Sequence, residues 1–572
     1  MNVTEKYSFT KVDSIYTDLR NERREWEAEW RQISDYLLPG SGIYQTYAKP
    51  RKRKLTTTNV INTVGEDALY ILTSGMHGRL TSPALPWFRL KWGDPQLEAL
   101  EPLVAWLQES EEILQAALHS STFYSVINSF YIEYAGFGTA STYVGEDTGS
   151  DSVPFNFQLL TAGEFAFSLG ADGDLDIFCR TIYMSQRQLV DKFPDTASQE
   201  TKNAVKTNAA GVDKIELAIV EFIAKEKWQD KNYVRLFYEV TGTATKTRDA
   251  NQKPLQVDGF YEHPYPIARW STIGSDTYGI GPGSRAIPDI KRLQEMEKAF
   301  LMATHKGINP PLNIPARMRG KVNSLPGGFN YYQNPNETVN ELYRVNFDYQ
   351  GVGSAVERVE QRIQRNFFND VFMSAARDPN ASPLRTGQVN AQEQEKLLRL
   401  GPVVERLQAE YLTKTLRRCF NILHRKEWLP ELPEELARLV GDFEIELISP
   451  MAVAQKAVKS QGVDAFMGFV GQAAQFDETI MDNINADAAV RDRADVEGVN
   501  LGILRTEDEV ADIRTNRAKQ VAAAQEAEAQ KANQEQAQYA ESENVANRKT
   551  NAEAGQILAD TQATAREAGF LQ

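Results

Sequence analysis

The feature that most constrains this chain is a pair of amphipathic segments of matched length, 284–306 and 354–376, on either side of a stretch that cannot be helical. In each segment apolar residues recur every three or four positions, which is typical of a helix with one buried face. These positions are Ile287, Ile290, Leu293, Met296 and Phe300 in the first segment and Val356, Val359, Ile363, Phe367 and Val371 in the second. Each helix would be about 35 Å long at 1.5 Å per residue.

The intervening stretch, 307–353, is dense in residues that interrupt helices. The breakers are Pro310, Pro311, Pro315, Gly320, Pro326, Gly327, Gly328 and Pro335. Two helices of equal length joined by a compact module favour a hairpin. We therefore predict a long helical arm with 307–353 at its tip.

The rest of the chain predicts an α+β, mainly α-helical protein. Before residue 270, helical patterns alternate with short strand-like runs such as 176–182 and 233–238. A long helical stretch is expected from about 386 to 426, interrupted at Gly401-Pro402, where the proline is well placed to open a second helix. With 572 residues, the chain is long enough for several cores.

The C-terminal segment, 505–572, holds 17 alanines and 9 glutamines and few large apolar residues. Alanine, glutamine and glutamate favour helix. So little apolar surface cannot bury a core within one chain. The segment is therefore either a frayed tail or a helix that neighbouring copies of the same chain stabilise.

The formal net charge of −15 argues against a protein that holds DNA phosphates tightly. It fits a protein past which DNA slides, although acidity can equally serve solubility alone. The basic run at 49–54 stands out, and it is either a contact for nucleic acid or an acidic neighbour, or a solvated loop. Neither a signal core nor an apolar run of membrane-spanning length is present, and Cys179 and Cys419 form no disulfide or metal pattern.

No motif in the sequence predicts catalysis, a metal or a cofactor. A phosphate-binding loop, a zinc-binding His-Glu-x-x-His and a Gly-x-Ser-x-Gly elbow are all missing, and the five histidines are scattered. The segment 172–176 alternates carboxylates like the start of a calcium loop. However, Ile177 and Tyr183 stand where such a loop needs glycine and glutamate, so we predict a β-turn between two strands.

Several motifs, in their shared order and spacing, resemble those of the head-to-tail connecting (portal) proteins of short-tailed, podovirus-type phages. The resemblance covers about 20–433. The matching segments are Arg24-x-Trp26-x-x-x-Trp30 leading to Leu38-Pro39, Leu80-Thr81-Ser82-Pro83 with Trp87-Phe88, Glu133 followed by Phe137-Gly138-Thr139-Ala140, and Tyr278-Gly279-x-Gly281-Pro282 followed by Ile290-Lys291-x-Leu293. Residues 383–389 resemble the family's threonine-rich segment, but the family more often has Thr-Ala-Thr-Glu-Val there.

The resemblance implies a portal fold with named parts. Residues 1–270, together with 388–480, would form the wing, and the clip would be 307–353. The first stem helix would be 271–306, of which 284–306 is helical. The second stem helix would be 354–376. A tunnel loop would span 377–387, and 481–572 would form a C-terminal helical crown.

It also implies a function: a ring, usually of twelve copies, at the capsid vertex, through which double-stranded DNA is packaged and ejected. The expected partners are terminase, tail adaptor proteins, and the major capsid and scaffolding proteins, with no membrane. Assembly would take place in the host cytoplasm and the product would reside in the virion. The residues expected to serve these roles are Arg377, Asn380, Ser382, Leu384 and Arg385 in the tunnel loop, Lys291, Arg292, Lys298, Arg362 and Arg365 on the stem, and Arg317, Arg319 and Lys321 on the clip.

Two rival hypotheses remain at this stage. A nuclease or terminase subunit would need a carboxylate–metal cluster or an ATP-binding loop, and the sequence offers neither. A structural or scaffolding protein of the virion without a channel would suit the helical C-terminus but not the aromatic-rich first 430 residues.

Overall fold

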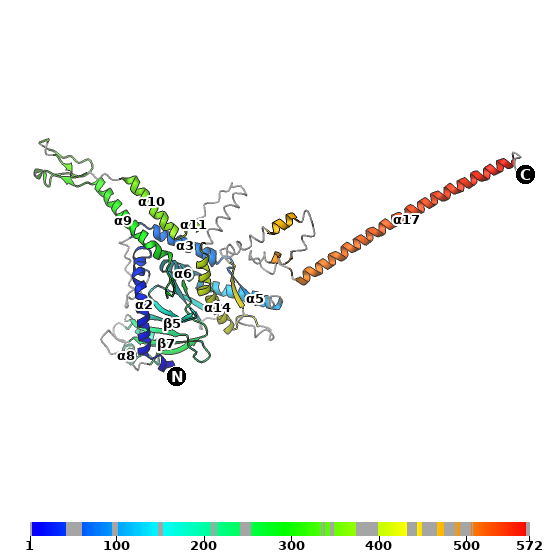
Figure 1. The fold of residues 1–572 in the computed structure, drawn as a ribbon. Coiled ribbons are helices and arrows are strands. Elements are labelled where there is room, and N and C mark those ends of the chain that lie inside the picture. Colours follow the sequence, from blue (N-terminus) through cyan, green and yellow to red (C-terminus); the bar gives the residue numbers. More distant parts are fainter. Residues whose placement is uncertain are drawn as a thin grey trace. The chain divides into compact units, whose positions relative to one another are not determined.

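The computed structural model describes residues 3–39, 41, 60–93, 101–146, 153–207, 212–213, 216–240, 253–332, 334–335, 338–343, 348–372, 399–431, 443–448, 466–473, 485, 487, 489–491, 505 and 507–567. The chain divides into two compact units, 1–463 and 464–572. The first unit combines helices with antiparallel sheets, and the second is mostly helical where it is described (Figure 1). The predicted class, α+β and mainly helical, is confirmed.

A five-stranded antiparallel sheet, in the order β4-β5-β6-β7-β8, forms one end of the first unit. Its strands are β4 (Phe165–Leu169), β5 (Leu175–Ser185), β6 (Glu216–Ala224), β7 (Tyr233–Val240) and β8 (Gln256–Phe260). Alternate residues of β6 face opposite sides, as the two-residue period of a strand requires. Phe222 packs with Phe9 and Val12 of helix α2 (Phe9–Tyr36), whereas Ile219 packs with Leu189 of α7 (Gln186–Lys192).

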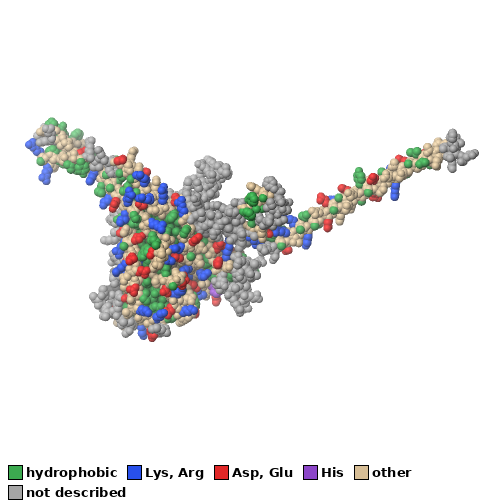
Figure 2. All heavy atoms as spheres, in the orientation of Figure 1, with side chains coloured by type: hydrophobic (Ala, Val, Ile, Leu, Met, Phe, Trp, Pro, Cys, Tyr) green, Lys and Arg blue, Asp and Glu red, His purple; other side chains and the backbone are tan. Residues whose placement is uncertain are grey.

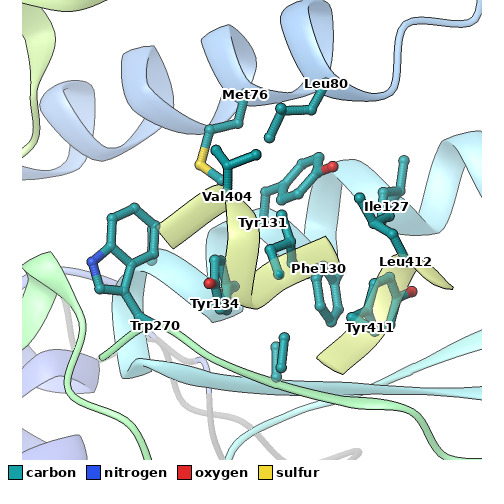
Figure 3. Close-up of a cluster of buried hydrophobic side chains, with 14 of the residues drawn as sticks. Met76, Leu80, Ile127, Phe130, Tyr131, Tyr134, Trp270, Val404, Tyr411 and Leu412 are labelled. Atoms are coloured by element: carbon teal, nitrogen blue, oxygen red, sulfur yellow. The ribbon is translucent and has the colours of Figure 1, made fainter. Parts of the chain in front are cut away.

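The larger core lies between a smaller sheet, β3-β2-β9, and several helices. The strands are β2 (Thr139–Glu146), β3 (Phe155–Leu160) and β9 (Ile267–Arg269). The helices include α3 (Val64–Leu80), α5 (Glu101–Ser120), α6 (Phe123–Phe137), α13 (Gly401–Leu407) and α14 (Thr413–Arg425). A π-helical turn, Gln408–Leu412, joins α13 to α14. Its wide turn directs Tyr411 onto Phe130, with ring centroids 4.0 Å apart (Figure 3). The same turn brings the Tyr411 hydroxyl 2.9 Å from Thr142 Oγ1.

The helix expected over 386–426 is observed from Gly401 to Arg425, and Pro402 stands in its first turn as predicted. Residues 386–398 lie outside the described part of the chain. A two-stranded sheet pairs β1 (Phe88–Trp92) with β12 (Phe443–Leu447), so two segments that are far apart in the sequence lie side by side. The strand-like pattern around Trp87-Phe88 is thus confirmed, with a partner strand that the sequence did not indicate.

The first unit also contains several short elements. They are α1 (Val3–Lys6), α8 (Gln199–Lys206), the single helical turn α11 (Asn369–Phe372), the 3-10 turn η2 (Ala316–Met318) and the two-residue strands β10 (Leu312–Asn313) and β11 (Asn340–Glu341). In the second unit, α17 is one continuous helix, Glu507–Glu567. Among the residues described, no helix is long and apolar enough to cross a membrane.

Candidate functional site: a helical arm with an exposed tip

The predicted helical hairpin is present. Helix α9 (Pro282–Ile308) and helix α10 (Tyr349–Asn366) pack side by side and project from the body of the first unit (Figure 1). The predicted bounds of α9 are nearly right. Those of α10 are wrong at both ends, because it begins at Tyr349 instead of 354 and ends at Asn366 instead of 376.

Local capping explains both errors. Asp348 Oδ1 accepts a hydrogen bond from the backbone nitrogen of Gly351 at 3.0 Å, which starts α10 ahead of its glycines. At the other end Phe367 is fully buried and Phe368 adopts a left-handed backbone, with φ of 54°. A left-handed residue terminates a helix, so Val371 reaches the core from the separate turn α11.

The root of the arm is a backbone contact between glycines. The start of α9 crosses the end of α6 so closely that a Cβ atom on Gly283 would lie 2.1 Å from the carbonyl oxygen of Gly136. A Cβ on Gly281 would lie 2.6 Å from the carbonyl oxygen of Ala135, and Gly138 has φ of 81°. Only glycine permits such an approach. Two of the motifs that carry the family resemblance, at 137–140 and 278–282, therefore meet at this crossing.

A second attachment holds the middle of α9. Gln294 is buried, and its Oε1 accepts hydrogen bonds from the backbone nitrogens of Ile61, at 2.6 Å, and Asn62, at 2.9 Å. Its Nε2 donates to the Asn62 carbonyl oxygen at 2.7 Å, and Asn62 Nδ2 donates to Glu360 on α10 at 2.9 Å. The chain segment before α3 is thus fastened to both helices of the arm.

Beyond Gln294 the arm leaves the core. No described side chain from 295 to 358 is buried, and Leu301 and Met302 of α9 are about half exposed. An apolar face that emerges from the core in this way usually meets another protein surface. The outer half of the arm is therefore available for contacts with other molecules.

The cations predicted on the stem differ in their surroundings. Lys291 is half-buried, with its Nζ 5.8 Å from the centroid of the Tyr36 ring. Arg362 is exposed but forms an ion pair with Asp289 of α9, with 2.5 Å between Nη2 and Oδ1. The side chains that extend into solvent are Arg292, Lys298 and Arg365. The sequence analysis missed Arg358, whose position one turn before Arg362 is visible in the spacing itself.

The tip carries the three predicted basic residues, all exposed: Arg317, Arg319 and Lys321. It also exposes large apolar side chains that were not predicted, notably Leu325, Phe329 and Tyr331, with exposed fractions of 72%, 80% and 87%. Figure 2 shows hydrophobic and basic side chains together on this part of the molecule. The aromatic run at 329–332 between the breakers was the signal available in the sequence. Among its described residues, the tip has only the short β10–β11 pair as a sheet.

The predicted tunnel-loop residues lie outside the described part of the chain. They are Arg377, Asn380, Ser382, Leu384 and Arg385, and the basic run at 49–54 is likewise outside it.

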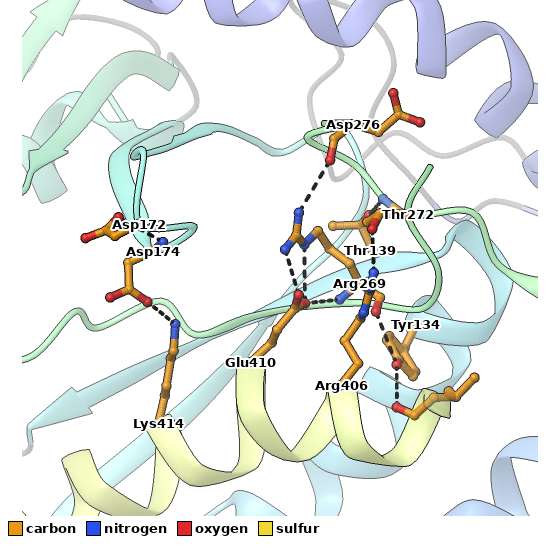
Figure 4. Close-up of polar contacts among 12 residues, drawn as sticks. Tyr134, Thr139, Asp172, Asp174, Arg269, Thr272, Asp276, Arg406, Glu410 and Lys414 are labelled. Atoms are coloured by element: carbon orange, nitrogen blue, oxygen red, sulfur yellow. Dashed lines mark hydrogen bonds and ion pairs between the residues drawn. The ribbon is translucent and has the colours of Figure 1, made fainter. Parts of the chain in front are cut away.

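The acidic segment at 172–176 is a turn between β4 and β5, as predicted. Lys225 Nζ lies 2.5 Å from Asp172 Oδ2. Lys414 Nζ of α14 lies 2.8 Å from Asp174 Oδ1 (Figure 4). Lysines already neutralise these carboxylates, which leaves little attraction for a cation. The described residues contain no group of three or more His, Cys, Asp or Glu side chains that could hold a metal ion.

A partly buried ion pair fixes the π-helical turn to the small sheet. Arg269 of β9 donates to Glu410, with 2.6 Å between Nη2 and Oε1, and its backbone nitrogen donates to the same carboxylate at 2.9 Å. Next to it, Arg406 Nη1 donates to Thr272 Oγ1 at 2.6 Å (Figure 4). Charge-assisted, two-pronged contacts of this kind set orientation. They hold α13 and the π-helical turn that follows it against β9 and Thr272, which precede the arm in the chain.

Comparisons with known proteins agree with the motifs. The chain is 30% identical over 523 residues to the probable portal protein of Bordetella phage BPP-1, covering 90% of this chain and 92% of that protein. It is also 30% identical over 518 residues to the portal protein of Salmonella phage epsilon15, covering 89% and 90%. A solved structure titled virion of native gene transfer agent (GTA) particle aligns with 70% of this chain and 94% of the solved chain at a TM-score of 0.31 and 10% identity, too weak a likeness to inform the fold.

A family model covers nearly the whole chain. The model described as bacteriophage head to tail connecting protein matches residues 10–504. That range includes both attachments of the arm and its whole tip. The chain belongs to the bacteriophage head to tail connecting protein family.

Proposed function

We propose that this chain is the portal subunit of a phage: copies form a ring at the capsid vertex, and double-stranded DNA passes through its channel during packaging and ejection. The observation that carries the proposal is the arm, a hairpin of two helices rooted in an α+β body and free of the core over its outer half. The names of the two relatives support it. The body would be the wing, α9 and α10 the stem, and 307–353 the clip.

The ring would contain twelve copies, each packing one face on a different face of its neighbour. A duplex that must slide needs weak contacts, and the net charge of −15 fits walls that repel phosphate. Arg292, Lys298 and Arg365 would then supply a few basic positions along the channel. Arg377 and Arg385 would approach the phosphates most closely from the tunnel loop.

The tip would be the docking platform for terminase during packaging and for tail adaptor proteins afterwards. Exposed aromatic side chains beside arginines are typical of protein interfaces, where they supply most of the binding energy. Phe329, Tyr331, Arg317 and Arg319 combine these properties. The major capsid and scaffolding proteins would contact the wing, and assembly would take place in the host cytoplasm. The protein would contribute no catalysis.

Electron microscopy of the purified full-length chain tests the ring. Closed rings with a central hole are expected. Monomers, filaments or particles without a hole would refute the proposal.

The channel is tested by charge reversal in the assembled ring. Arg377→Glu with Arg385→Glu should reduce DNA packaging or retention while rings still form. Lys206→Glu on α8, an exposed cation of the wing, is the matched control. Normal DNA packaging by the double variant would refute the proposal that Arg377 and Arg385 approach the DNA phosphates.

The tip is tested by truncating its aromatic side chains. Phe329→Ala with Tyr331→Ala should change stability by less than about 0.5 kcal/mol, because both side chains are exposed. Sedimentation of assembled rings with the phage's terminase should show weakened binding. Full binding by this variant would rule out these side chains as the docking surface.

A further inference from the structure

The tip of the arm contains two tight turns that follow each other closely in the chain. In the first turn, 318–321, the backbone nitrogen of the fourth residue donates to the carbonyl oxygen of the first at 3.0 Å, and Gly320 has φ of 75°. In the second turn, 325–328, the same bond measures 2.9 Å, and Gly327 has φ of 76°. A bond from the fourth residue to the first, with a left-handed third residue, is the pattern of a type II turn. Both turns therefore have a defined shape, which glycine at the third position makes accessible.

Two asparagine side chains close the second turn into a loop, 323–330. Asn330 Oδ1 accepts a hydrogen bond from the backbone nitrogen of Asn323 at 2.6 Å, and Asn330 Nδ2 donates to the Asn323 carbonyl oxygen at 2.8 Å. Inside the loop, Asn323 Oδ1 accepts a hydrogen bond from the backbone nitrogen of Leu325 at 3.0 Å. None of the described residues from 309 to 343 is buried. Hydrogen bonds and turn geometry, instead of a core, therefore hold this loop in shape.

The loop carries two bulky apolar side chains, Leu325 and Phe329, which flank the turn and are exposed by 72% and 80%. Apolar side chains in this position add little to the stability of their own chain, because they stay in water when it folds. They suit a partner that offers an apolar pocket. Such a partner would bind the loop at a low cost in conformational entropy, because the loop already has its shape in the free protein.

The first turn indicates the charge of that partner. It exposes Arg319 and Lys321, and Arg317 precedes it, whereas Glu341 is the one acidic residue among those described from 309 to 343. A basic surface in a protein with a net charge of −15 favours an acidic partner. The basic turns of two neighbouring tips would repel each other, so a second copy of this chain does not suit the surface. We therefore expect a pocket with acidic side chains around its rim.

The size of the loop distinguishes between the two partners expected at the tip. An aromatic side chain buries about 150–250 Å² and leucine somewhat less, so the two side chains together offer roughly 300–400 Å². A stable interface takes about 800 Å² from each partner. So small a contact suits the terminase, which must leave after packaging, better than a tail protein that stays. We propose that the loop inserts Leu325 and Phe329 into an apolar pocket of the terminase. Asn330 is the residue that positions them, and this inference rests on the docking function proposed for the tip.

The rates at which assembled full-length rings bind the purified terminase test the positioning role. Asn330→Ala keeps both apolar side chains but lets the loop open, so a smaller fraction of loops is competent to bind. The association rate should fall about tenfold while the dissociation rate stays unchanged. Phe329→Ala removes a contact instead, so it should raise the dissociation rate about tenfold or more. Ser324→Ala is the matched control, because its side chain is exposed and forms none of the hydrogen bonds of the loop.

Unchanged rates in Asn330→Ala overturn the positioning role, and so does faster dissociation, because Asn330 would then contact the terminase itself. Terminase binding that does not weaken as salt is added overturns the acidic rim. Tail adaptor proteins form the second arm of the experiment. Loop variants that lose adaptor binding but keep terminase binding overturn the choice of partner.

Two outcomes separate this inference from the proposed function. If wild-type rings bind no terminase, the docking function itself fails. If wild-type rings bind it and Leu325→Ala with Phe329→Ala binds equally well, only this inference fails. Electron microscopy should show closed rings for every variant, because none of the described tip residues contributes to the core.

Discussion

Replacing Gly283 by alanine tests whether the glycine crossing holds the arm in place. The new Cβ would lie 2.1 Å from the Gly136 carbonyl oxygen and 2.9 Å from its carbonyl carbon, so the obstacle is backbone and cannot rotate away. Helix α9 would have to move by about 1 Å or more to reach an ordinary contact distance. Helix propensity alone favours alanine by up to about 1 kcal/mol. Overpacking costs about 1–3 kcal/mol, and a backbone obstacle puts this site near the upper end of that range. After the gain in helix propensity we expect a net loss of about 2 kcal/mol.

Denaturant unfolding followed by tryptophan fluorescence measures this loss, because Trp30 packs on Tyr278 with 5.3 Å between ring centroids, just before the crossing. The matched control is Gly78→Ala in α3, where nothing lies within 4 Å of the added Cβ. The free energy of unfolding of that variant should stay unchanged or rise by up to about 1 kcal/mol. If Gly283→Ala unfolded at the same denaturant concentration as Gly78→Ala, the crossing would not constrain the arm.

Two further perturbations concern groups inside the body. Gln294→Ala should cost about 2–4 kcal/mol, because it leaves backbone nitrogens without partners, and hydrogen exchange at residues 61 and 62 should accelerate, unlike in the exposed control Glu295→Ala. Unchanged exchange would contradict the attachment. Burial lowers the pKa of His263 from its usual 6.5 to about 3, so the unfolded chain takes up the proton first and stability falls as the pH drops below about 6.5. Between pH 7 and 4.5 His263 should contribute a loss of about 2–3 kcal/mol, measured by denaturant unfolding, and His263→Gln should remove that contribution.

Local signals in the sequence predicted the arm well. Apolar periodicity and clustered prolines act within a few turns, and they located α9, α10 and the tip between them. The start of α10 was missed because Gly351 and Gly353 suggest a break, whereas the Asp348 cap makes that stretch helical. The packing of β1 on β12 was missed for another reason. A pairing between residues 88–92 and 443–447 depends on the whole intervening fold, and neither segment specifies the other.

The same contrast between local sequence signals and long-range packing applies to the candidate site. The basic residues of the tip could be named from the sequence because charge is visible there. The exposure of Phe329 and Tyr331 could not, since an aromatic run in a loop is as often a small core as a surface. Likewise Arg362 was expected on the stem as a candidate for the channel, and only the structure places Asp289 beside it. Sequence identifies which groups are present, and packing decides which of them remain available.

The glycine crossing also explains how a small error at the root of the arm would reach its tip. Gly283 lies about 16 Å along α9 from the attachment at Gln294, and Ile308 lies about 21 Å beyond it. A displacement of about 1 Å at the crossing, with Gln294 as the pivot, therefore moves the end of the helix by about 1.3 Å in the opposite direction. In a closed ring every copy would carry the same displacement, so the tips would move together and the opening between them would change. Backbone-to-backbone contact at the root leaves no side chain whose rotation could absorb such an error, which is a physical reason for glycine on both sides of the crossing.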